Sequence, residues 1–110
     1  MKKKIYLIRH AQSEANAALD LDNPTFYYDA RLTNLGKDQT LKTRKKLINV
    51  NFDLMISSPL TRTLQTFSLI FPKPINNTIV LPLIREHLDH SCDVGRQPEI
   101  LKREFPHFNL

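Results

Sequence analysis

Residues 52–67 read FDLMISSPLTRTLQTF and change abruptly from a strand pattern to a helix pattern. The apolar run at residues 52–56 is typical of a buried strand. Ser58 followed by Pro59 is a typical helix start, because proline has the φ angle of a first helical residue and lacks an N–H that would be unpaired there. The apolar residues behind it keep spacings of four, three and four: Leu60, Leu64, Phe67 and Phe71. We therefore expect a strand that runs directly into a helix.

The alternation of strand and helix patterns continues on both sides of this unit. Further strands are expected at residues 4–8 and 78–81, and further helices at residues 33–48 and 97–105. Thr33 is the expected N-cap of the longer helix. The inward stripe of that helix is expected to contain Leu35, Leu41, Leu47 and Ile48. Strands and helices that alternate with short connections predict an α/β fold with a parallel sheet and covering helices.

The length of 110 residues predicts a single domain. Apolar residues make up 41% and charged residues 25%, which is typical of a globular protein and excludes disorder. No apolar stretch approaches the roughly 20 residues of a membrane span, and the short apolar run behind the basic start ends at Arg9, so no secretion signal is expected either. The single cysteine, Cys92, excludes an internal disulfide and favours a reducing compartment, the cytoplasm.

The formal net charge of +5 suits an anionic partner, although solubility alone also explains such an excess. The basic cluster at residues 44–46 lies on an expected helix and has no interleaved aromatic residues, so we expect no nucleic-acid partner. Two glycines are too few for a dinucleotide fingerprint or a glycine-rich phosphate loop. The charge by itself does not distinguish a phosphate ester from an acidic lipid headgroup, and no membrane partner is expected.

Charged side chains follow each of the three expected strands. Arg9 and His10 follow the first strand, Arg62 follows the second on a helix start, and Arg85 with Glu86 follows the third. Because ligands of such sheets bind outside the carboxyl ends of the strands, we expect these side chains to meet at one edge. Guanidinium groups and helix amides bind phosphate oxygens, a neutral imidazole can act as a nucleophile, and a carboxylic acid can protonate a leaving oxygen. Charge alone indicates a phosphate site and leaves open whether phosphoryl transfer occurs.

Four motifs carry a family resemblance. Residues 9–16 (RHAQSEAN), 32–39 (LTNLGKDQ), 57–66 (SSPLTRTLQT) and 83–86 (LIRE) follow one another in this order. They resemble the Arg-His-Gly opening, the Leu-Thr-x-x-Gly-x-x-Gln helix start, the Ser-Pro-x-x-Arg-x-x-Gln-Thr segment and the proton-donor stretch of the histidine phosphatase superfamily, the phosphoglycerate mutase-like proteins. The resemblance covers residues 4 to about 105, nearly the whole chain.

The resemblance implies a three-layer α/β sandwich with a mainly parallel sheet. It also implies that residues 1–110 form the amino-terminal portion of a histidine phosphatase domain, because the family's second catalytic histidine has no counterpart here. His107 follows no expected strand and does not match that position. The fold would then be incomplete at its carboxyl-terminal end, as a fragment or a truncated gene product, with an unpaired sheet edge and exposed apolar surface.

The resemblance also implies roles for six residues. His10 would attack phosphorus and form a phosphohistidine, and Glu86 would protonate the leaving oxygen and then activate water. Four residues would bind the substrate phosphate: Arg9, Ser13, Asn16 and Arg62. No metal or cofactor is expected, because the arginines supply the positive charge that Mg²⁺ supplies elsewhere. The spacing of His87, His90 and Cys92 also matches no closed zinc set.

Two departures from the family pattern bear on function. Ala11 stands where glycine is usual, and Ala15 stands where the cofactor-dependent mutases have tryptophan. The second departure favours a phosphatase over a glycolytic mutase. We therefore expect a metal-independent phosphatase of small phosphate esters. The alternative is a truncated, catalytically defective module that binds phosphoanions or a protein partner. The sequence leaves the identity of the ester and the oligomeric state open.

Overall fold

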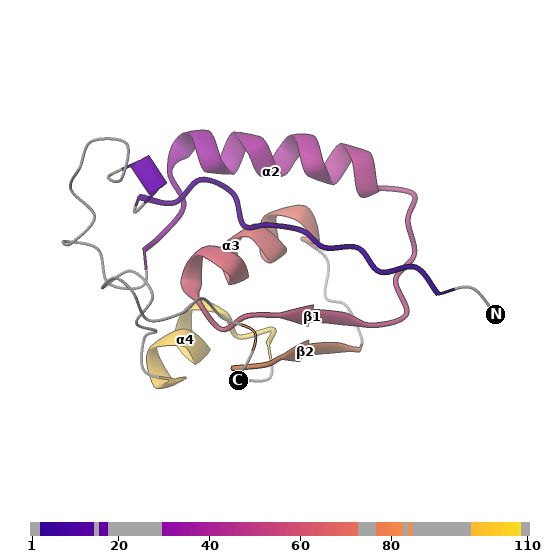
Figure 1. The fold of residues 1–110 in the computed structure, drawn as a ribbon. Coiled ribbons are helices and arrows are strands. Elements are labelled where there is room, and N and C mark those ends of the chain that lie inside the picture. The colour runs from indigo at the N-terminus through magenta and orange to yellow at the C-terminus, as the bar shows by residue number, and fades with distance from the viewer. Residues whose placement is uncertain are drawn as a thin grey trace.

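A parallel strand–helix–strand unit lies at the centre of the structure (Figure 1). The structure is a computed structural model that describes residues 3–14, 16–17, 30–72, 77–82, 84 and 98–108. Its helices and strands are α2 (Asn34–Leu47), β1 (Met55–Ser57), α3 (Thr61–Ile70), β2 (Thr78–Val80) and α4 (Pro98–Glu104). The predicted α/β fold with a parallel sheet is confirmed.

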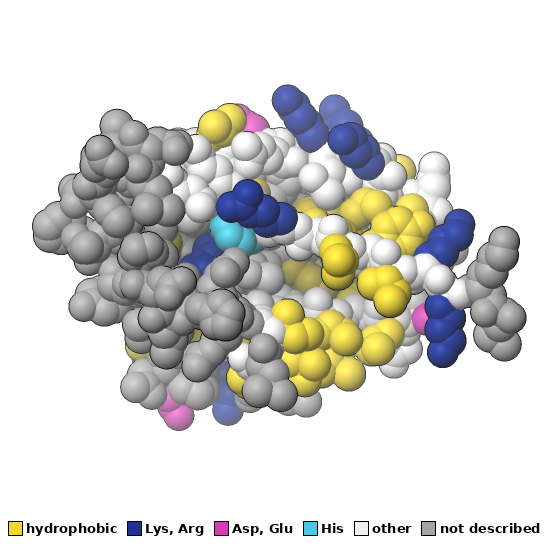
Figure 2. All heavy atoms as spheres, viewed as in Figure 1, with side chains coloured by type: hydrophobic (Ala, Val, Ile, Leu, Met, Phe, Trp, Pro, Cys, Tyr) yellow, Lys and Arg dark blue, Asp and Glu magenta, His cyan; other side chains and the backbone are white. Residues whose placement is uncertain are grey.

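The sheet has one covered and one open face. β1 and β2 pair in parallel with Ile56 opposite Ile79, and α3 connects them and contacts β1. Met55 and Ser57 point to the covered face and are buried, whereas Ile56 and Ile79 are 45% and 44% exposed. Figure 2 shows hydrophobic side chains gathered on one face of the molecule. A parallel sheet is normally covered on both faces, so the expected exposed apolar surface is present.

The predicted strand at residues 4–8 is wrong. In the described part of the chain no strand pairs with this run, and Ile5 and Leu7 are 85% and 94% exposed. The run is tethered by a side chain instead: the ring of Tyr6 packs edge-on against Phe52, with centroids 5.2 Å apart. A β-type pattern describes a run that suits a sheet, but a strand also needs a neighbour whose N–H and C=O groups are free to pair.

The predicted N-cap of α2 is confirmed, and the predicted inward stripe is not. The Thr33 hydroxyl accepts a hydrogen bond from the Gly36 N–H over 3.0 Å. The leucines and the isoleucine at Leu35, Leu41 and Ile48 are exposed. The buried positions are Gly36 and Thr40, and at Gly36 the helix lies so close to the backbone of Gln12 that a Cβ would overlap it.

The start of α3 lies two residues beyond the predicted one. The helix begins at Thr61 with Leu60 as its N-cap. The Ser58 hydroxyl accepts the Leu60 N–H over 3.2 Å and so closes a turn before the helix rather than capping the helix itself. The apolar spacing is correct, because Leu60 and Leu64 are 2% and 0% exposed.

The main core joins α3, β2 and α4. Leu64, Leu101 and Phe105 are buried together, and Val80 and Phe108 pack against them. The last helix therefore lies at its predicted place and packs on α3. None of the helices in the described ranges has the length and the apolar character that crossing a membrane would require.

Candidate active site

The segment that follows the exposed run is held by hydrogen bonds to side chains as well as to backbone. Four consecutive amide N–H groups donate to acceptors from four places in the chain: Ala11 to Thr66 Oγ1 (3.0 Å), Gln12 to Gln39 Oε1 (3.0 Å), Ser13 to Asn16 Oδ1 (3.0 Å) and Glu14 to the Arg31 carbonyl (2.8 Å). The last of these accompanies an isolated antiparallel bridge between Ser13 and Leu32. Residues 11–14 therefore have a defined position without being part of the sheet.

The start of α2 is the main support of this segment. The Thr33 N–H donates to the Gln12 carbonyl over 3.0 Å, and the Thr33 hydroxyl lies 2.7 Å from Gln12 Oε1. A Cβ at Gly36 would overlap the Gln12 carbonyl oxygen. Three residues of the motif at residues 32–39 therefore contact Gln12. Thr33 forms hydrogen bonds with it, Gly36 lies against its carbonyl, and Gln39 accepts its N–H.

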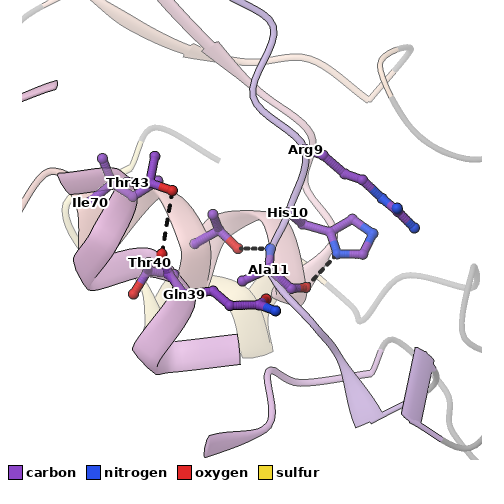
Figure 3. Close-up of a pocket in the computed structure, with 8 residues that line it drawn as sticks. Arg9, His10, Ala11, Gln39, Thr40, Thr43 and Ile70 are labelled. Atoms are coloured by element: carbon purple, nitrogen blue, oxygen red, sulfur yellow. Dashed lines mark hydrogen bonds between the residues drawn. The ribbon is translucent and has the colours of Figure 1, made fainter. Parts of the chain in front are cut away.

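The imidazole of His10 is oriented by the backbone of the next residue, Ala11. Its Nδ1 lies 2.7 Å from the Ala11 carbonyl oxygen (Figure 3). A carbonyl can only accept a hydrogen bond, so Nδ1 carries the proton and the lone pair of the neutral imidazole is on Nε2. The ring is half-buried, and the side chain of Arg9, which is exposed, extends to the same side of the segment (Figure 3). This is the protonation pattern of an imidazole whose far nitrogen can act as a nucleophile.

Ala11 fits its place without backbone strain. Among the residues that the structure describes, Asn77 is the one non-glycine residue with a positive φ. Ala11 therefore has a backbone conformation that an L side chain adopts freely. The departure from the family's glycine therefore does not place an alanine in the left-handed region that favours glycine.

Arg62 is buried in the first turn of α3, where its side chain is 3% exposed. Its carbonyl accepts a 2.7 Å hydrogen bond from the Thr66 hydroxyl, and the same hydroxyl accepts the Ala11 N–H. One threonine therefore joins the backbone of the His10–Ala11 step to the helical turn that carries Arg62. Residues 9–11 and 62, which are far apart in the sequence, lie on adjacent parts of the structure.

Ser13 and Asn16 bond to each other. The Ser13 hydroxyl and N–H both donate to Asn16 Oδ1 over 3.0 Å, and the Asn16 N–H donates back to Ser13 Oγ over 3.2 Å. This reciprocal arrangement is a capping box at the helical turn that follows Ser13. Ser13 is 1% exposed and is occupied by the cap. Since the cap uses the oxygen of Asn16, the donor group Nδ2 is what Asn16 can offer to a ligand.

A small cleft of about 130 Å³ lies on the other side of the segment, between its backbone and the two long helices. It is lined by Arg9, His10, Ala11, Gln39, Thr40, Thr43, Thr66 and Ile70. Figure 3 shows the side chains of Arg9 and His10 pointing away from Thr43 and Ile70. The cleft therefore adjoins Gln39 and Thr66, the side chains that hold the backbone next to His10.

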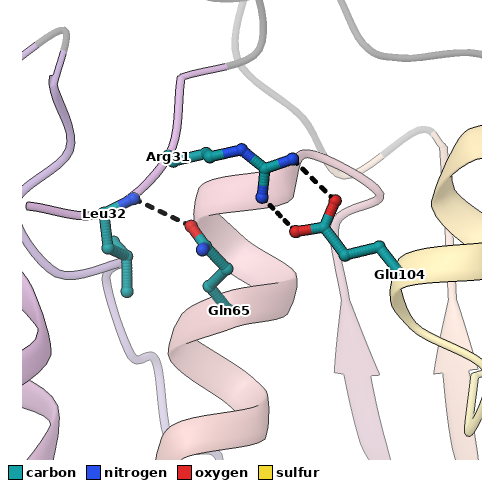
Figure 4. A network of polar contacts seen from close by, with 4 residues as sticks. All are labelled: Arg31, Leu32, Gln65 and Glu104. Atoms are coloured by element: carbon teal, nitrogen blue, oxygen red, sulfur yellow. Dashed lines mark hydrogen bonds and ion pairs between the residues drawn. The ribbon is translucent and has the colours of Figure 1, made fainter.

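A second polar network links residues 31–32, which lie beside the segment, to α3 and α4. The Arg31 guanidinium forms a two-pronged ion pair with the Glu104 carboxylate, of which the Nη2–Oε2 contact is 2.8 Å (Figure 4). Next to it, the Leu32 N–H donates to Gln65 Oε1 over 2.8 Å. Gln65 and Thr66 on α3 thus each accept a backbone N–H from a different distant segment.

Two predicted residues, Arg85 and Glu86, lie outside the described residues, as do His87, His90 and Cys92. Within the described ranges, no three His, Cys, Asp or Glu side chains are placed to hold a metal ion. Gln39 and Thr66 are supports that the sequence interpretation missed. The signal was present for Thr66, since it lies one helical turn after Arg62 and shares its face.

Comparison with known proteins gives a consistent result. The model of the histidine phosphatase superfamily (branch 1) matches residues 5–108. Phosphoglycerate mutase-like protein 1 of Arabidopsis thaliana is 42% identical over 72 residues, which are 58% of this chain and 26% of that protein. A probable phosphatase of Schizosaccharomyces pombe is 28% identical over 97% of this chain and 51% of its own length.

One solved structure shows the same fold. A candidate alpha-ribazole-5'-P phosphatase of Escherichia coli superposes with a TM-score of 0.64 and 24% identity, over 90% of this chain and 48% of that one. The chain therefore spans about half the length, or less, of these relatives.

Proposed function

The chain belongs to the histidine phosphatase superfamily, and from this membership we propose that it is a phosphatase that hydrolyses small phosphate monoesters through a phosphohistidine on His10. Nε2 attacks phosphorus, the bond from phosphorus to the ester oxygen breaks, and the leaving oxygen takes a proton from the Glu86 carboxyl group. Water then attacks the phosphohistidine, Glu86 takes a proton from that water, and phosphate leaves with Nε2 restored.

The hydrogen bond from His10 Nδ1 to the Ala11 carbonyl is the observation that carries this proposal. It supports Nε2 as the attacking atom, because the proton of the neutral ring is on the other nitrogen. It also stabilises the ring after attack, when Nδ1–H must remain bonded as the imidazole gains positive character.

Side chains would supply the positive charge at the phosphate. The N–H groups of residues 11–14 all have acceptors within the protein, so they are not available to an anion. Arg9 and Arg62 would bind the non-bridging oxygens, Asn16 would donate from Nδ2, and Ser13, bonded to Asn16, would line the phosphate pocket beside it. Arg62 is buried, and a guanidinium away from water binds a phosphate dianion more strongly than an exposed one. With this charge in place the reaction needs no metal ion.

A binding module without turnover is the second candidate. The chain spans about half of each of the two relatives that it covers most fully, so the turnover of those relatives is not carried over to it. Such a module would keep the anion site and lose the transfer of the phosphoryl group.

Labelling with an alkaline quench separates the two candidates, because phosphohistidine survives in base and is lost in acid. The chain is mixed with a radiolabelled phosphate monoester, quenched, and tested for acid-labile phosphate on protein. We expect label on the unaltered chain and on His107→Ala, which removes an exposed histidine of α4's flank, and none on His10→Ala. Binding of inorganic phosphate without label on any variant would exclude the phosphatase and favour the binding module.

A further inference from the structure

Both peptide groups that flank Ala11 are held by side chains from the long helices. The peptide between His10 and Ala11 donates its N–H to Thr66 Oγ1 on α3, over 3.0 Å. The peptide between Ala11 and Gln12 donates its N–H to Gln39 Oε1 on α2, over 3.0 Å. The carbonyl of this second peptide is the group that accepts His10 Nδ1–H, over 2.7 Å.

These three hydrogen bonds act on one another. The carbonyl and the N–H of a peptide group share one plane, so the acceptor at Gln39 sets the direction in which the Ala11 carbonyl points. Hydrogen bonds at both ends of one peptide group also polarise each other. Thr66 fixes the plane of the preceding peptide group, between His10 and Ala11. The Thr66 hydroxyl donates its proton to the Arg62 carbonyl over 2.7 Å, so its lone pairs face the Ala11 N–H.

We propose that Gln39 and Thr66 are positioning residues of the nucleophile, which hold the Ala11 carbonyl on Nδ1 and thereby keep the proton of the neutral His10 ring on Nδ1. The inference rests on the proposed role of His10, and it adds two residues that touch neither the imidazole nor the phosphate. If either peptide plane turned, the carbonyl would leave Nδ1 and the proton could move to Nε2, which would then be unable to attack.

The chain offers a matched control for this pair. Thr43 on α2 donates to the Gln39 carbonyl, as Thr66 does to the Arg62 carbonyl, but in the described residues it accepts no N–H from the segment. Thr66→Val and Thr43→Val therefore remove the same kind of bond within a helix. Only the first also removes an acceptor for Ala11. Gln39 is exposed, so Gln39→Met tests the second peptide plane with little risk to folding.

The test reads the tautomer of His10 directly. The full chain is labelled with isotopic nitrogen at histidine, and the two ring nitrogens of His10 are observed by NMR at a pH where the ring is neutral, with His10→Gln used for assignment. We expect an Nδ1–H tautomer in the unaltered chain, Thr43→Val, Thr66→Ser and Gln39→Glu, because each keeps both acceptors. We expect a mixture of tautomers in Thr66→Val and Gln39→Met.

Two further measurements separate positioning from general damage. The phosphohistidine should form at least roughly tenfold more slowly in Thr66→Val and Gln39→Met, as expected of a misaligned nucleophile. Their affinity for inorganic phosphate should change by less than about threefold, since the arginines are untouched. A single Nδ1–H tautomer retained in Gln39→Met, or an Nε2–H tautomer in the unaltered chain, would overturn the inference. A chain that shows the expected tautomers and never becomes labelled would overturn the proposed function alone.

Discussion

Gly36 lies so close to Gln12 that a Cβ on the glycine would overlap the Gln12 carbonyl oxygen. The same carbonyl accepts the Thr33 N–H, so it cannot move away without breaking that bond. The absence of a side chain at position 36 is therefore what allows α2 to reach the segment that carries His10.

This contact predicts a cost for the smallest substitution at the glycine. Gly36→Ala should destabilise the chain by about 2 kcal/mol, because overpacking against backbone outweighs the gain in helix propensity of about 1 kcal/mol. Urea unfolding measures the change. Asp38→Ala, at an exposed position of the same helix, is the control and should change the free energy of unfolding by less than about 0.5 kcal/mol. Equal stability of the two variants would contradict the close approach.

Arg62 and Arg44 form a matched pair for anion binding. Arg62 is buried beside the His10 segment, and Arg44 is exposed on α2. Arg62→Ala should weaken the binding of inorganic phosphate or vanadate at least about tenfold, as expected when a charged hydrogen bond is lost. Arg44→Ala should change it less than about twofold. Titration calorimetry at fixed salt measures both, and similar losses in the two variants would show that the anion binds through overall charge.

One substitution separates the two roles of Asn16, in the cap with Ser13 and in the proposed binding of phosphate. Asn16→Asp keeps an oxygen for the Ser13 cap, so the midpoint of thermal unfolding should hardly change. It replaces the donor Nδ2 by a negative oxygen, so phosphate affinity should fall at least about tenfold. Asn34→Asp makes the same charge change at the exposed start of α2 and should leave phosphate affinity nearly unchanged. Tight phosphate binding by Asn16→Asp would remove this residue from the site.

The ion pair between Arg31 and Glu104 should contribute little to stability. Its two side chains are 41% and 27% exposed, so water and salt screen the attraction. A double-mutant cycle with Arg31→Met and Glu104→Gln should give a coupling energy of about 1 kcal/mol at most, and less in high salt. The cycle is required because both residues have further interactions. A coupling that is large and independent of salt would mean that the pair is shielded from water.

Local signals predicted the elements that local rules control. The Thr33 cap, the apolar spacing of α3 and the proline-bounded helix α4 each depend on neighbours within one or two turns, and the structure contains all three. The family motifs likewise identified the superfamily, because they depend on residue order alone.

The predictions that the structure contradicts depend on contacts between residues far apart in the sequence. The run at residues 4–8 has a strand pattern, but no pattern within it reports whether a partner strand is adjacent. Leu35 and Leu41 have helical spacing but are exposed, and the face that α2 buries carries Gly36, which lies against Gln12. The acceptors for the N–H groups of Gln12 and Ala11 lie 27 and 55 residues away, beyond the reach of any local rule.

The exposed isoleucine pair on the open face of the sheet favours association between copies of this chain. Ile56 and Ile79 lie opposite each other in the parallel ladder, and Ile5 and Leu7 are still more exposed. Water released when such patches meet favours contact between copies, so the osmotic second virial coefficient should be negative at moderate salt.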